Sequence, residues 1–198
     1  MEDIKQVLAL FDNEEKWNSY IELSNMKDAL VSELKTRLLN ELRRIGNEKL
    51  KDSGWVFYDR FKDGIGIIPV DSDLGVGVVF EYWKRGGEYS RSSVIFAITE
   101  EKEGIKYSKL HEQIRQIREK LPLQDYSENP HGWEPYIKRI PATVFRVSDD
   151  VTSIEQCLYR AKDYAKELAE DIWKEVFEPF ANKNVGKELK SIVEVTRC

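Results

Sequence analysis

The pattern of hydrophobic and polar positions changes its period once along the chain, near Gly54. Before this point, apolar residues recur every three to four positions, which is typical of one face of a helix. After it, short runs rich in β-branched and aromatic residues are separated by KDG, DSD and RGG, which are turn sequences. We therefore predict a helical segment over residues 1–53 and a sheet region over residues 54–150.

The helical segment has recognisable ends. Asp12 or Asn13 can cap a helix that begins EEKW, and Gly46 is a typical stop. The apolar stripe between Met26 and Ile45 fits either a helix packed on a sheet or a coiled coil. We favour the packed helix, because the seam of a coiled coil normally persists for more heptads.

The sheet region contains four consecutive strand-like runs, which predict an antiparallel meander. They are GWVFYDRF, GIGIIPV, LGVGVVFEYWK and SSVIFAITEE. A middle helix is expected over SKLHEQIRQIREKL, and strand character returns over residues 142–147. The prediction is a mainly antiparallel sheet of four to five strands.

The C-terminal part is expected to be one long helix, residues 151–182, that opens with the capping-box sequence TSIE. The tail, residues 183–198, can add a short strand or remain loose. A chain of 198 residues can bury a core without a metal or disulfide. The expected fold is therefore a single α+β domain with the helices packed on the sheet.

The composition of the chain argues against several classes of function. Two cysteines and two histidines make neither a disulfide framework nor a zinc cluster, so no metal or other cofactor is expected. No apolar run is long enough to span a bilayer, and the acidic N-terminus does not fit a signal peptide, which predicts a cytoplasmic protein. The net charge of −5, without a basic arm, argues against a duplex-binding domain.

The sequence contains one candidate catalytic site, which is of the metal-dependent nuclease kind. A Mg²⁺-dependent nuclease of the PD-(D/E)XK type needs a carboxylate on one strand and an acid–x–lysine triplet on the next. Glu81 and Lys84 fail this test, because residues three apart on a strand face opposite sides. Asp71, Glu100 and Lys102 have suitable spacing, although charged residues leaving a sheet give the same pattern, and we favour that interpretation.

The order of several segments resembles a region found C-terminal to the catalytic core in bacterial and phage PD-(D/E)XK-like proteins. The resembling segments lie within residues 10–147 and are EEKWNSYIELSNMKDAL, GWVFYDRF, a glycine-spaced strand, VVFEYWK, SSVIFAI and WEPY. The chain lacks the catalytic core, and its PVD sequence departs from the adjacent proline and aspartate of the family motif. The resemblance implies an accessory or recognition domain from a defence-related or mobile-element setting.

A binding surface is a second candidate, formed by a basic, aromatic hairpin and one flank of the middle helix. Its residues are Tyr82, Trp83, Lys84, Arg85 and Arg91 from the hairpin and His111, Arg115 and Arg118 from the helix. The competing interpretation, which we favour, is that the aromatic rings pair on the sheet and the cations are solvated.

The loop over residues 126–136 is a third candidate. It is long for a connector and contains Trp133 and Tyr136. Trp133 can fold back over the core as a plug, and the Trp and Tyr side chains can alternatively anchor a protein interface.

These observations predict a non-catalytic interaction module, phage- or defence-associated, that acts through a protein partner. The alternative is a nucleic-acid-binding or degenerate nuclease-like protein, and Mg²⁺ is expected only for a nuclease.

Overall fold

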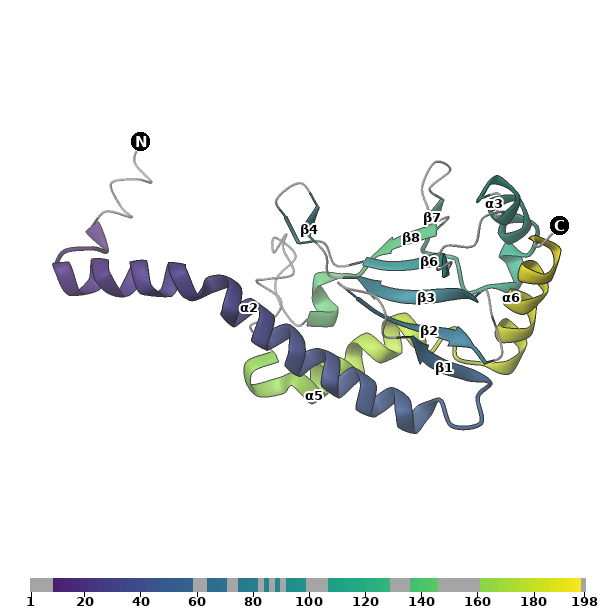
Figure 1. Cartoon of the computed structure of the whole chain (residues 1–198), viewed down its shortest axis with the longest axis horizontal. Coiled ribbons are helices and arrows are strands. Elements are labelled where there is room, and N and C mark those ends of the chain that lie inside the picture. The colour runs from purple at the N-terminus through teal and green to yellow at the C-terminus, as the bar shows by residue number, and fades with distance from the viewer. Residues whose placement is uncertain are drawn as a thin grey trace.

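A computed structural model describes residues 9–58, 64–70, 75–81, 84–85, 88–89, 92–98, 107–128, 136–145 and 161–196. The fold is α+β with antiparallel strand pairing, as predicted (Figure 1). In the described part of the chain, no helix is long and apolar enough to cross a membrane.

The main sheet has six strands in the order β1-β2-β3-β6-β8-β7, rather than the four or five predicted. The strands are β1 (Trp55–Tyr58), β2 (Gly64–Pro69), β3 (Gly75–Glu81), β6 (Ser92–Ile98), β7 (Ser127–Glu128) and β8 (Tyr136–Arg139). Since β8 lies between β6 and β7, the sheet as a whole is not a simple meander. A separate two-stranded sheet joins β4 (Lys84–Arg85) to β5 (Glu88–Tyr89).

The centre of the sheet is buried on both faces. Ile65 and Ile67 on β2, like Val78 and Phe80 on β3, have no exposed surface. The neighbours Gly66 and Val79, which point to the opposite face, are buried too. Continuous burial of this kind requires cover on both sides of the sheet.

Helix α2 (Glu14–Lys49) is one continuous helix of 36 residues. It begins as predicted after Asn13, whose Oδ1 accepts a hydrogen bond from the Lys16 backbone N–H at 2.9 Å. The predicted stop at Gly46 is wrong, because the helix continues to Lys49. Gly46 is buried there, and it serves close packing instead of chain termination.

The middle of the chain forms α3 (Tyr107–Gln116) and the short 3₁₀ helix η1 (Arg118–Lys120). The strand expected over residues 142–147 is wrong in its described part, where residues 142–145 form the 3₁₀ helix η2 (Ala142–Phe145). Pro141 has no N–H to donate to a sheet, so the strand pairing ends at Arg139 in β8.

The C-terminal part contains α5 (Ala161–Ile172), the π-helix η3 (Trp173–Phe177) and α6 (Lys183–Thr196). The described part of the tail, residues 183–196, is therefore a helix and not the short strand or loose end that was expected. Val185, Leu189 and Ile192 are buried at helical spacing, which is the signal that sequence reasoning missed. Asn182 caps α6 by accepting the Val185 N–H at 3.0 Å.

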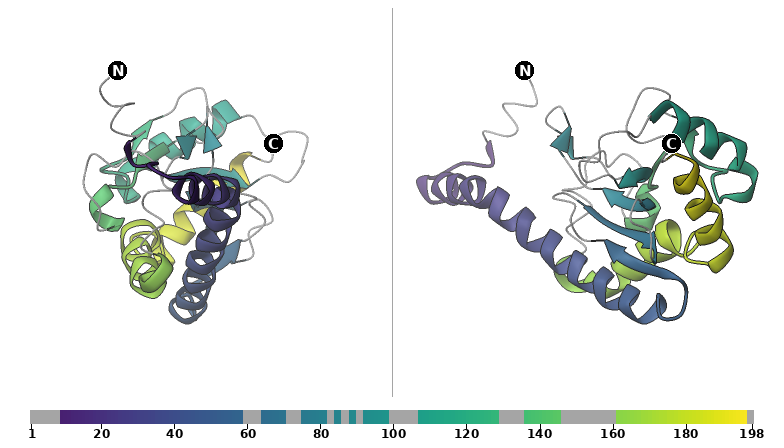
Figure 2. Two further views of the ribbon diagram at one scale, coloured as in Figure 1. Left: turned by 90° about the vertical axis from the view of Figure 1, so that its left-hand side faces the viewer. Right: turned by 45° about the vertical axis from the view of Figure 1, so that its right-hand side comes forward.

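Helix α2 has two halves with different surroundings. The packed half, residues 31–49, lies along α5 and buries Val31, Leu34, Leu38, Leu42 and Ile45 (Figure 1). The free half, residues 14–30, extends beyond the sheet and α5, as the oblique view on the right of Figure 2 also shows.

Candidate protein-binding surface

The catalytic candidates Asp71, Glu100 and Lys102 lie outside the described residues. Glu81 and Lys84 belong to different sheets, since Glu81 ends β3 and Lys84 begins β4. Among the residues that the structure describes, no three His, Cys, Asp or Glu side chains gather as metal ligands would.

The hairpin part of the predicted binding surface is only partly described. Tyr82, Trp83 and Arg91 lie outside the described residues, as does Trp133 in the long loop. The backbones of Lys84 and Arg85 form β4, which pairs with β5 in the register Lys84 to Tyr89 and Arg85 to Glu88.

The remaining predicted binding residues do come together, but mainly in contacts within the chain. His111 and Tyr136 are buried, with 9% and 1% of their surfaces exposed. The Arg118 guanidinium lies over the Tyr136 ring, 5.6 Å from its centre. Tyr136 therefore belongs to the core, whereas Trp133, the residue predicted as a plug, lies outside the described residues.

Arg115 forms an ion pair with Glu128, so that helix α3 is tied to the edge strand β7. This hydrogen bond is the main reason that the pKa of Glu128 lies below, and the pKa of Arg115 above, the ordinary value. In the predicted basic surface, Arg115 on the middle helix is therefore already paired with a carboxylate of the same chain. A phosphate would have to compete with Glu128 for the Arg115 side chain.

Lys138 is also used internally. It is largely buried on β8, and its Nζ lies 2.5 Å from a Glu175 oxygen on η3 and 3.4 Å from Asp125. The same ammonium lies 5.9 Å from the centre of the Tyr126 ring. These contacts join the sheet to the π-helix, and they leave this lysine little surface for a ligand.

Exposed apolar side chains gather instead on the free half of α2. Every residue from 12 to 30 is exposed. Five large apolar or aromatic residues of this segment have 40–67% of their surface in solvent. They are Trp17, Tyr20, Ile21, Leu23 and Met26, and Leu30 adds a sixth at 56%. Single exposed apolar residues are ordinary, whereas several of them grouped on one surface make that surface a candidate interaction site.

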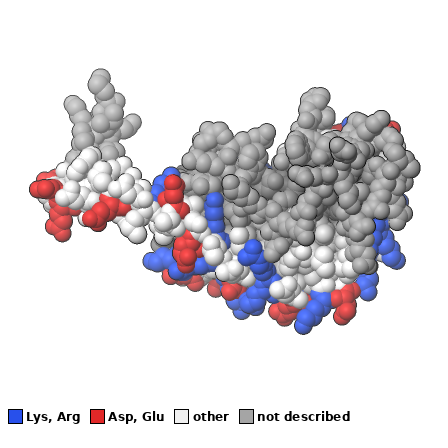
Figure 3. All heavy atoms as spheres, in the orientation of Figure 1, with Lys and Arg blue, Asp and Glu red and all other residues white. Residues whose placement is uncertain are grey.

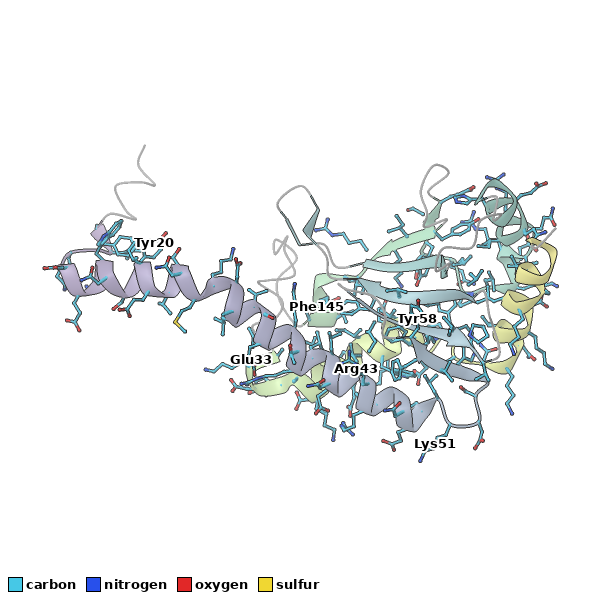
Figure 4. The ribbon with its side chains drawn as sticks, viewed as in Figure 1. Tyr20, Glu33, Arg43, Lys51, Tyr58 and Phe145 are labelled. Atoms are coloured by element: carbon cyan, nitrogen blue, oxygen red, sulfur yellow. The ribbon has the colours of Figure 1, made fainter. Side chains whose placement is uncertain are left out.

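The tip of this segment holds an aromatic cluster, which we define as Phe11, Trp17 and Tyr20. Phe11 folds back on the first turns of the helix, with ring centres 5.4 Å from Trp17 and 4.9 Å from Tyr20. Tyr20 is labelled at the far end of the helix in Figure 4. The cluster fixes how the chain enters the helix, in the manner of a hydrophobic staple.

Next along the helix lies an apolar patch, which we define as Leu23, Met26 and Leu30. Their spacing of three and four residues keeps them within about 60° around the helix axis. A hollow of about 600 Å³ at the start of the same helix is different in character. It is lined by residues with polar or charged side chains, which are Asn13, Glu14, Glu15, Asn18, Ser19 and Glu22.

Sequence reasoning assigned Met26 and Leu30 to the packed stripe and did not propose the free half as a site. The available signal was the charge distribution along α2. Residues 12–30 carry five acidic and two basic side chains, whereas residues 31–49 carry three acidic and five basic ones. Figure 3 shows the acidic side chains gathered at the projecting end of the helix.

The chain matches no protein-family model, no curated protein and no solved structure. The resemblance to the accessory region of PD-(D/E)XK-like proteins, with its phage or defence setting, therefore stays a prediction.

Proposed function

We propose that the chain is a non-catalytic interaction module that binds a protein partner through the free half of α2. The observation that carries the proposal is the exposure of the apolar patch and the aromatic cluster on a helix that projects from the body. Helices present such faces to grooves or to other helices, with anchors three and four residues apart. The spacing of Leu23, Met26 and Leu30 meets this requirement.

Charge supports a protein over a nucleic acid as the partner. The free half has an excess of acidic side chains, which repel phosphates. In the described part of the predicted basic surface, Arg115 is paired with Glu128 and Arg118 lies over Tyr136. Nucleic-acid binding through the hairpin remains the competing hypothesis, and the same experiment can reveal it.

The proposal is tested by isolating the tagged full-length chain from the cells that naturally express it, after brief chemical crosslinking. The test variant combines Leu23→Glu, Met26→Glu and Leu30→Glu. The matched control combines Asn18→Glu, Asn25→Glu and Ser32→Glu, which add the same charge at exposed polar positions of the same helix. Both variants should unfold at nearly the wild-type temperature, because exposed positions contribute little packing.

We expect a protein to co-purify in stoichiometric amount with wild type and control, whether it is another protein or an untagged copy of the chain. The patch variant should recover at least about tenfold less of it, as loss of central apolar anchors predicts. Full retention of the partner by the patch variant would overturn the proposal. So would recovery of nucleic acid in place of a protein.

A further inference from the structure

We infer that the partner is a second copy of this chain, and that the two copies pair their α2 helices antiparallel through the apolar patch. This inference rests on the proposed function and specifies the partner. The paired surface lies on the free half of α2, where the exposed apolar residues are.

The patch has the spacing of a helix–helix seam. Leu23, Met26 and Leu30 are separated by three and then four residues, which is the alternation of seam positions in a coiled coil. The stretch also has a leucine at each end and a methionine near its middle. A second copy rotated by 180° therefore places apolar residues opposite apolar residues. Self-complementarity of this kind is what a two-fold interface between identical chains requires.

Charge selects the antiparallel direction. The free half has a net charge of −3 between residues 12 and 30, and the packed half has a net charge of +2 between residues 31 and 49. In a parallel pair, the two acidic tips would lie side by side and repel. In an antiparallel pair centred on the apolar patch, the acidic tip of each copy lies instead along residues 31–41 of its partner, which carry two basic and two acidic side chains. The two acidic tips are thereby kept apart.

The packed half can accept such a partner. On the side of α2 that continues the apolar patch, Arg37, Glu41 and Arg44 are at the surface, and their ion pairs stay within the helix. Exposed pairs of this kind rearrange at little cost. The buried stripe on the core side, including Leu38 and Leu42, keeps the packed half fixed on α5. The packed half of α2 in each copy is thus a fixed surface against which the free half of the other copy can lie.

The short seam sets the expected strength. One apolar patch per chain covers about two helical turns, and Arg37 of each copy lies level with the acidic first turn of the other. We expect a reversible dimer whose dissociation constant rises with salt concentration. A permanent dimer would need a longer apolar seam.

Sedimentation equilibrium of the purified full chain tests the pairing. Wild type and the Asn18→Glu/Asn25→Glu/Ser32→Glu control should reach twice the 23.2 kDa of one chain as concentration rises. The Leu23→Glu/Met26→Glu/Leu30→Glu variant should remain at the mass of one chain with an unchanged thermal midpoint. A wild-type chain that stays monomeric, or a patch variant that still dimerises, would overturn the inference.

Spin labels test the direction. A single label at Asn18→Cys, in a chain whose Cys157 and Cys198 are replaced by serine, reports the distance between the same position in the two copies. With the two-fold axis at the centre of residues 23–30, the helix rise places the labels roughly 25 Å apart along the axis. A parallel pair would bring them to about 10 Å, the spacing of neighbouring helices. The short distance would contradict the antiparallel arrangement.

Failure of this inference can be told apart from failure of the proposed function. A monomeric wild-type chain that still captures a different protein, and loses it in the patch variant, overturns the second copy and leaves the interaction module intact. A monomeric chain that captures no protein overturns both.

Discussion

At the scale of single residues, Gly46 shows how tightly α2 is held on the body. A methyl group at this position would overlap the ring of Phe57 and lie 2.8 Å from Trp173. The two rings contact each other edge to face, with centres 6.3 Å apart, so neither moves without disturbing the other. Glycine is required here because β1 and η3 approach the helix backbone closely.

We predict that Gly46→Ala destabilises the fold, although alanine is the better helix former. The gain in helix propensity is about 1 kcal/mol, and the overlap with two core rings costs about 1–3 kcal/mol. Chemical denaturation should show a net loss. The exposed neighbour Asn47→Ala is the control and should be neutral or slightly stabilising. Adding Phe57→Leu should recover part of the loss only if the overlap causes it.

A second residue-scale prediction concerns Tyr136. Its hydroxyl is buried with no hydrogen-bond partner in the described structure, and burial raises its pKa. Removing an unsatisfied buried hydroxyl costs little, so Tyr136→Phe should leave the free energy of unfolding unchanged or raise it by up to about 1 kcal/mol. The Phe ring still receives Arg118. A loss above about 1 kcal/mol would show that the hydroxyl has a partner.

At the scale of elements, the sequence predicted the features that depend only on residues close together in the chain. The Asn13 cap is set by side-chain chemistry at one turn, and the alternation around Ile65 and Ile67 defines a buried strand. The ends of elements were less predictable. The sequence around Gly46 predicts the end of a helix. The glycine is instead required by the close approach of Phe57 and Trp173, which are distant in sequence.

The candidate site was less predictable for the same reason. His111, Arg115 and Arg118 share a helix flank in the sequence, but their partners are supplied by β7 and β8. Conversely, Met26 and Leu30 continue the periodic stripe of Leu34 and Leu38. Periodicity shows that residues share a face, and it does not show where the packing partner α5 ends.

The two halves of α2 should differ in stability. Helices draw most of their stability from tertiary packing, and every residue of the free half is exposed, whereas the packed half has several buried side chains. Amide hydrogen exchange at low concentration should be fast for residues 14–30 and slow for residues 31–49. At concentrations that favour association, residues 20–30 should become protected in wild type. The patch variant should show no such protection.

At the scale of the whole molecule, the pH dependence of the folding stability depends on how the edge of the sheet is joined to the helices. Strand β7 is only two residues long, and the Arg115–Glu128 pair ties it to α3. Because the pKa of Glu128 is lower in the folded chain than in the unfolded one, the unfolded chain binds the proton more readily. The pair therefore stabilises the fold above the unfolded pKa of Glu128. That contribution is lost as pH falls through the lower, folded pKa.

We predict that Arg115→Gln lowers the thermal midpoint at neutral pH, and that the difference from wild type shrinks as the solution is acidified. The difference should vanish well below the ordinary glutamate pKa of about 4.3, where Glu128 is protonated in both folded and unfolded chains. Thermal unfolding across this pH range measures it. Arg43→Gln is the control, because Arg43 donates to the uncharged amide of Asn40 at 3.2 Å. An Arg115→Gln difference that persisted unchanged in acid would show that Arg115 stabilises the fold through packing and not through Glu128.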